Sequence, residues 1–157
     1  MTAPYQSVDR EAIWAALFTY LRASVGSRFA TMGRRHIPPP DLLPILQPAL
    51  FVVQVKENHK PKPRGLPTQL ELHGFLIVYV PAPMANEAPG QETVLAATTL
   101  NTIFREIDDA LQPDNSNGMF TLGGMVSHCW IEGGTDMDPG IFGAQAAAVM
   151  PINILVP

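Results

Sequence analysis

The stretch that decides the fold reads Leu122-Gly123-Gly124-Met125-Val126-Ser127-His128-Cys129-Trp130-Ile131-Glu132. A loop rich in Gly, Asp and Pro follows, and then a mostly apolar run over residues 144–156. This pattern predicts a strand, a connection and a second strand. Side chains of a strand alternate between its faces, so adjacent His128 and Cys129 point opposite ways and cannot form a catalytic pair. A well-specified sheet with unusual loops is typical of a self-assembling structural protein rather than an enzyme.

The composition predicts a single domain over residues 1–157. Hydrophobic residues make up 46% of the chain and charged residues only 15%, against about 25% in typical domains. The neutral surface suits burial against partners, although a monomer of this composition is equally compatible. The single cysteine excludes an intrachain disulfide. We expect no secretion signal, since no basic segment precedes an apolar one near the start. No apolar run approaches the roughly 20 residues that span a bilayer, so we expect no membrane contact.

The charges of the chain are unevenly distributed. Residues 1–64 hold nine Lys/Arg and four Asp/Glu, whereas residues 65–157 hold one Lys/Arg and ten Asp/Glu. One interpretation is chance clustering of solvated charges. The other is a subunit with complementary faces, suited to head-to-tail packing in a ring. The candidate partner-contact residues are Lys56, Lys60, Lys62, Arg64, Asp136 and Asp138.

The periodicity of apolar residues predicts an α+β fold. Helical spacing predicts helices over residues 9–23 and 92–111, and alternating apolar residues predict strands over 50–55, 70–80, 126–131 and 147–156, with a further short strand over 28–35. We expect a mostly antiparallel, mixed sheet of about four to five strands packed against these two main helices. Pro38-Pro39-Pro40 predicts an extended segment, because each ring fixes φ and removes a donor.

The connection between the second and third predicted strands is the most unusual loop. Residues 57–67 are basic and broken by prolines, and they exceed the two to five residues usual for a hairpin. Because long loops of this kind often carry function, we expect residues 56–64 to contact a neighbouring ring or tube. Lys60, Lys62 and Arg64 would face acidic partner surface.

Other chemistry is poorly supported by the sequence. The four histidines lie in separate segments without metal-ligand spacing, so no metal or other cofactor is expected. Glu71 and His73 share a strand face and could cooperate in a hydrolase, but such residues are more often the solvent-facing half of a strand. Residues 136–140 resemble the start of a calcium loop but lack its later ligands, which favours a tight turn. Trp130 is expected in the core.

Four groups of residues occur in a recognisable order over most of the chain. They are Trp14-Ala15-Ala16-Leu17-Phe18; Gln47-Pro48-Ala49-Leu50-Phe51; the run from Leu100-Asn101 through Ile107-Asp108 to Pro113; and the closing stretch Leu122-Gly123-Gly124, His128-Cys129-Trp130-Ile131-Glu132-Gly133, Gly143 and Pro151-Ile152-Asn153-Ile154-Leu155-Val156-Pro157. In this order the chain resembles tail terminator (tail completion) proteins of long-tailed phages and prophages.

The resemblance implies a structural virion protein at the head-proximal end of the tail, assembled in the host cytoplasm. Such a protein forms a homohexameric ring on the last ring of tail tube protein, stops tube polymerisation and presents a docking face to the head–tail connector protein, with incidental contact to DNA in the lumen. A head–tail connector or neck ring protein of the same assembly is the alternative. A small hydrolase-like domain using His73 and Glu71 is a distant third.

Overall fold

The structure is a computed structural model that describes residues 8–60, 69–81, 94–138 and 145–157. Two α-helices and six strands make up its regular elements. Three short 3₁₀ turns cover Gly26–Arg28, Pro39–Asp41 and Pro44–Leu46. The elements in chain order are α1 (Arg10–Val25), β1 (Thr31–Gly33), β2 (Ala49–Lys60), β3 (Gln69–Pro81), α2 (Val94–Ala110), β4 (His128–Ile131), β5 (Asp136–Asp138) and β6 (Gln145–Leu155).

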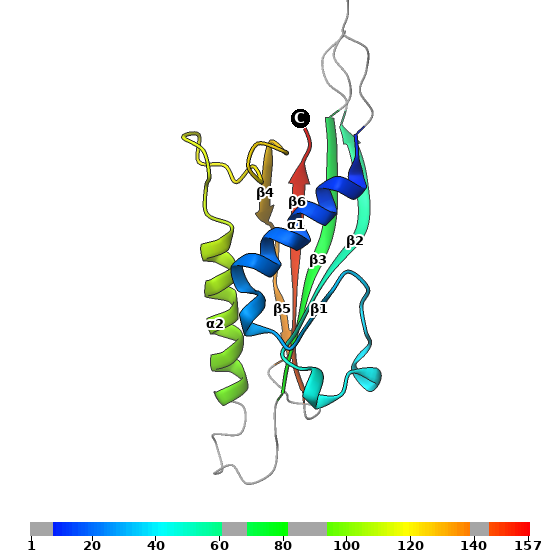
Figure 1. Ribbon diagram of the computed structural model, residues 1–157, viewed down its shortest axis with the longest axis vertical. Coiled ribbons are helices and arrows are strands. Elements are labelled where there is room, and N and C mark those ends of the chain that lie inside the picture. Colours follow the sequence, from blue (N-terminus) through cyan, green and yellow to red (C-terminus); the bar gives the residue numbers. More distant parts are fainter. Residues whose placement is uncertain (1–7, 61–68, 82–93, 139–144) are drawn as a thin grey trace, which may run out of the picture.

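The strands form one sheet in the order β1-β2-β3-β6-β4, with β5 also paired to β6. β1 runs parallel to β2 and every other pairing is antiparallel. Both helices pack against the same side of this sheet, here called the helix face (Figure 1). The α+β fold expected from the sequence, a mostly antiparallel mixed sheet against two helices, is therefore confirmed, with six strands in the described residues.

Local signals in the sequence explain where α1 begins and ends. The carboxylate of Asp9 accepts a hydrogen bond from the backbone N–H of Ala12 at 2.9 Å, which satisfies one of the free donors of the first turn. The N–H of Gly26 returns to the carbonyl of Arg22 and closes the last turn. The helix thus extends two residues beyond the predicted end at residue 23.

The helix face carries the main hydrophobic core. Its fully buried side chains come from both helices and three strands and include Leu17, Leu21, Leu50, Leu72, Leu76, Ile103, Ile107, Ile152 and Ile154. α1 approaches the sheet most closely at Gly74, where an added Cβ would lie 2.6 Å from Cη2 of Trp14 and 2.5 Å from the carbonyl oxygen of Val53. Only glycine leaves room for the indole of Trp14 over β3.

In the described part of the chain, the opposite face of the sheet is covered only at one end. There the segment between β1 and β2 folds back, and Leu42 packs against Ala49, Phe51 and Tyr79 in a second small core. The segment predicted as extended at Pro38-Pro39-Pro40 is instead a pair of 3₁₀ turns beginning at Pro39, because burial of Leu42 bends the chain back onto the sheet. Burial also raises the pKa of Tyr79.

Several predicted boundaries were wrong. β2 continues to Lys60 rather than ending at residue 55, so residues 57–60 belong to a strand and not to a loop. β1 is shorter than the predicted 28–35 segment, and β4 begins at His128 rather than at residue 126. α2 spans Val94–Ala110 within the predicted 92–111.

β5 occupies the first three residues of the tight turn predicted at 136–140, whose last two lie outside the described residues, and it pairs with β6 next to β4. The two strands are separated opposite Pro151, whose carbonyl accepts from the N–H of Glu132 at 3.2 Å. Proline has no N–H to donate toward the same side, so the ladder breaks there. The chain turns through Gly133, whose φ is +92°. No helix in the described part of the chain is long and apolar enough to cross a membrane.

Candidate interaction surfaces

The sequence-predicted contact residues lie at opposite edges of the sheet. Lys56 and Lys60 are exposed residues of β2, and Asp136 and Asp138 belong to β5 on the far side of β6. Lys62 and Arg64 lie outside the described residues. The registers Lys56↔His73, His73↔Asn153, Met137↔Ala148 and Ala148↔Val78 place all four described residues on the face away from the helices.

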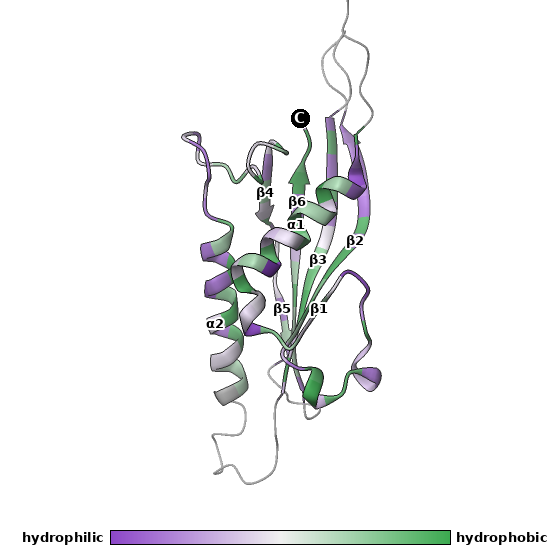
Figure 2. Cartoon of the chain, viewed as in Figure 1, coloured by the Kyte–Doolittle hydropathy of each residue, from purple (hydrophilic) through white to green (hydrophobic). Residues whose placement is uncertain are grey.

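The outer edge of β2 is unpaired over half of the strand. β1 pairs with it only as far as Phe51, and no other strand in the described ranges pairs with its outer edge. A bulge at Val55 shifts the register between Gln54 and Lys56. β2 also changes from hydrophobic to hydrophilic along its length (Figure 2). Its last residues, Val55 to Lys60, therefore form an exposed edge of the kind that accepts another strand.

The edge of the sheet farthest from β2 is formed by β4 and β5, which differ in how they are covered in the described residues. β4 is covered, because the N–H of Cys129 donates to the carbonyl of Phe120 at 2.9 Å. β5 pairs only with β6 in the described residues. Its central residue Met137 lies on the helix side, yet 57% of it is exposed, so α2 does not cover this edge.

Ion pairs organise the charged end of β2. The guanidinium of Arg10 binds the carboxylate of Glu57 and lowers the pKa of that carboxyl. Lys60 Nζ lies 2.5 Å from Oε2 of Glu71, which raises the lysine pKa. Lys56 is exposed and has no such partner within the described ranges.

Glu71 and His73 belong to a polar network on the opposite face of the sheet. Glu71 is only 5% exposed, so the expectation that it faces solvent was wrong. His73 Nδ1 donates to Asn153 Oδ1 at 2.6 Å, and Asn153 in turn donates to Glu132. His73 Nε2 lies 3.1 Å from Nδ2 of Asn58 and 3.3 Å from Oε1 of Glu71. These partners belong to neighbouring strands, so the alternating pattern of a single strand could not reveal them.

Trp130 closes one side of this network. Its Nε1–H donates to Glu132 Oε2 at 3.1 Å, and its ring stacks on His128 at a centroid distance of 4.7 Å. The indole is half-buried on the opposite face and lies outside the helix-face core, so the core position expected for it was wrong.

The polar network links side chains of β2, β3 and β6. The polar groups bound to His73 and Glu71 are two amides, a lysine and the neighbouring carboxylate, and no hydroxyl or thiol of the described residues hydrogen-bonds to either side chain. Cys129 points into the core, where burial raises the pKa of its thiol to about 12. No group of three or more potential metal ligands occurs in the described part of the chain.

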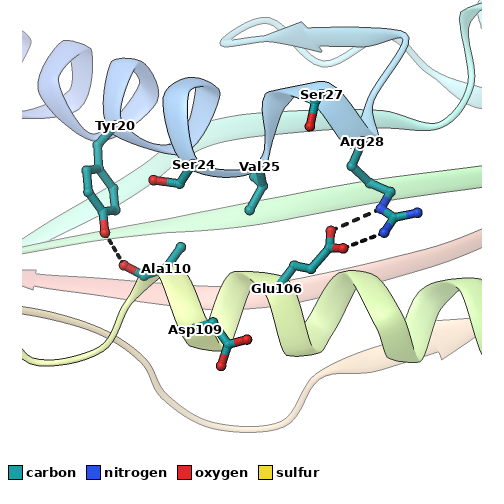
Figure 3. A pocket seen from close by; sticks show the side chains of 8 residues that line it. All are labelled: Tyr20, Ser24, Val25, Ser27, Arg28, Glu106, Asp109 and Ala110. Atoms are coloured by element: carbon teal, nitrogen blue, oxygen red, sulfur yellow. Dashed lines mark hydrogen bonds and ion pairs between the residues drawn. The ribbon is translucent and has the colours of Figure 1, made fainter.

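A hollow of about 640 Å³ lies between the two helices (Figure 3). Tyr20 donates its hydroxyl to the carbonyl of Ala110 across it. Arg28 binds Glu106 through two hydrogen bonds, one of 3.0 Å from Nε, and holds the pKa of the glutamate below its usual value. The Arg28–Glu106 ion pair and the Tyr20 hydrogen bond tie α1 to α2, and the exposed carboxylate of Asp109 also lines the hollow.

Comparisons with protein families and with curated proteins found no relative of the chain. No model of a known protein family matches the chain, and no curated protein matches it significantly in sequence. The functional interpretation therefore depends on the surfaces described above and on the motifs in the sequence.

Proposed function

We propose that the chain is a structural subunit that assembles head to tail into a ring and caps the tail tube of a long-tailed phage as its terminator. The observation that carries the proposal is the position of basic Lys56 and Lys60 at one edge of the sheet and acidic Asp136 and Asp138 at the other. A heterologous contact between two such edges repeats around a closed ring. The sequence motifs that resemble tail terminators favour the same role.

A cap also needs two unlike surfaces, one that fits the tube and one that does not copy it. The two ends of the subunit along its strands meet this need. One end carries the charged arm of β2 and β3, with Lys60 exposed. The other carries the short turns between β1 and β2, where Leu43 and Ile45 are 59% and 80% exposed. Polar and apolar ends would bind different partners.

A structural rather than catalytic role agrees with how the polar groups are used. His73 and Glu71 hold neighbouring strands together through Asn153, Asn58 and Lys60. Each buried polar group that is bonded in this way avoids a desolvation cost of about 1–3 kcal/mol. We propose that this network stiffens the sheet at the edge from which assembly proceeds.

The test is to add the purified protein to polymerising tail-tube protein of the same phage or prophage. We expect tube growth to stop and a ring of density to appear at one tube end in negative-stain images. Binding to a portal or stopper ring with no effect on tube length would instead indicate a head–tail connector. Rings that bind neither partner would contradict the proposal.

A further inference from the structure

We propose that subunits join by pairing the free edge of β2 in one copy with the edge of β5 in the next, in an antiparallel continuation of the sheet. The inference deepens the proposed ring and depends on it. Along one subunit β2, β3, β6 and β5 alternate in direction. A β2 strand beside the β5 strand of an equally oriented neighbour is therefore antiparallel, as strand addition to an exposed edge requires.

Side chains on the two edges match on both faces. On the face away from the helices, β2 offers Lys56 and Lys60 and β5 offers Asp136 and Asp138. On the helix side, Val55 is 52% exposed and shares a small hollow with Trp14 and Leu72, and Met137 is 57% exposed.

One register satisfies both faces at once. Setting Met137 opposite Glu57 of the neighbour brings Met137 beside Val55, Asp138 opposite Lys56 and Asp136 opposite Asn58. Opposite charges directly across two strands are favourable, as are neighbouring apolar side chains.

The positions of the two edges along the strands are compatible with a closed ring. Met137 is level with Leu50 of β2 through Ala148 and Val78. Glu57 follows Leu50 by seven positions in the sequence but lies only six ladder steps beyond it, since Val55 is the extra residue of the bulge. Six steps are about 20 Å, and the four strands of the repeat, β2, β3, β6 and β5, are about 19 Å wide. The strands would tilt by about 46° from the ring axis, at the upper end of the range of about 35–45° that is typical of closed barrels.

Charge reversal at the two edges provides the experiment. The first variant is Lys56→Glu/Lys60→Glu, in which both edges are acidic. The second is Asp136→Lys/Asp138→Lys, in which both are basic. We expect each variant alone to require about tenfold more protein than the wild type to assemble, with a larger difference at low salt. Mass photometry measures the assembled fraction.

The mixture of the two variants is the decisive sample. Every acidic β5 edge then meets a basic β2 edge, and every basic β5 edge meets an acidic β2 edge, so an alternating ring with an even number of subunits should form. The matched control is Arg105→Glu/Asp41→Lys, which reverses exposed charges away from both edges and should assemble as the wild type does.

Thermal unfolding of each variant separates assembly from folding. Lys60→Glu sets a second carboxylate beside Glu71. If that variant is destabilised, Lys56→Glu mixed with Asp138→Lys repeats the test without it. Single variants that assemble as the wild type does would overturn the pairing; this result is expected if the chain's own residues occupy the edge. A mixture that fails to assemble would overturn it too. A wild-type ring that does not bind tail tubes would count against the terminator role alone. A wild-type protein that stays monomeric with and without tubes would count against both.

Discussion

The two faces of the sheet use opposite chemistry although they share the same strands. Leu72 and Leu76 on the helix face are sealed under α1 and α2, whereas Glu71 and His73, their neighbours on β3, lie in a polar network on the opposite face. The helix face holds the fold together by apolar burial. In the described residues the opposite face is covered only at the Leu42 end, and its polar side chains bond to one another across neighbouring strands. The two faces thus hold the same strands together by different interactions.

Replacing Gly74 with alanine should give the largest effect and break the helix face. The new Cβ would lie 2.5–2.6 Å from backbone and indole atoms, and such overpacking costs about 3 kcal/mol of unfolding free energy. Chemical denaturation followed by circular dichroism measures the loss. Gly134→Ala is the matched control, since nothing lies within 4 Å of its added Cβ. Equal stability of the two variants would contradict the close packing of α1 on β3.

Asn153→Ala should have an intermediate effect and break the opposite face. Asn153 is buried and accepts from Nδ1 of His73, whose side chain is mostly buried, so its loss leaves that N–H without its partner and should cost about 1–3 kcal/mol. Asn58→Ala, at the exposed end of the same network, should cost about 0.5 kcal/mol or less. The same denaturation assay compares them, and a smaller loss for Asn153 than for Asn58 would show that the network does not stabilise this face.

Asp114→Asn should have the smallest effect. It tests the loop that covers the sheet edge at β4. The carboxylate of Asp114 accepts hydrogen bonds from the N–H of Gly123 and from the N–H and hydroxyl of Thr121, and these lower its pKa from the ordinary 3.8. It thereby holds the loop that covers β4. A lowered folded-state pKa stabilises the fold above the ordinary value, and this contribution is lost as the pH falls through the lowered value.

Thermal melts of the Asp114 variant from pH 7 to pH 2 measure this contribution. The melting temperature of Asp114→Asn should lie below that of the wild type at neutral pH, and the difference should shrink below about pH 4. Asp109→Asn, an exposed carboxylate in the last turn of α2, serves as the control. A difference that stays constant over the whole pH range would argue against the carboxylate contacts.

The sequence predicted most of the helices and strands whose apolar residues recur periodically. The strand expected at residues 70–80 is β3 (Gln69–Pro81) and the helix expected at 9–23 is α1, because the spacing of apolar residues is a local signal. The end of β2 was missed since its residues are charged, and their strand conformation depends on pairing with β3. β5 was missed for a similar reason: its three residues are held by β6, a partner distant in sequence.

The candidate residues divide in the same way. Charge distribution along the chain identified Lys56, Lys60, Asp136 and Asp138 as candidate contact residues, but only the strand order reveals that they lie on one face at opposite edges. The network around Glu71 could not be predicted, because Asn153 and Glu132 reach it from other strands.

Amide hydrogen exchange on assembled and dissociated protein tests the central claim most directly. In the dissociated subunit, the outward-facing amides of β2 between Val55 and Lys60 have no strand partner in the described residues, so they should exchange rapidly. On assembly, these amides and those of β5 should become protected together, while the amides of α1 remain unchanged. Protection that appears on α1 instead, or β2 amides that exchange equally fast in both states, would contradict assembly through the sheet edges.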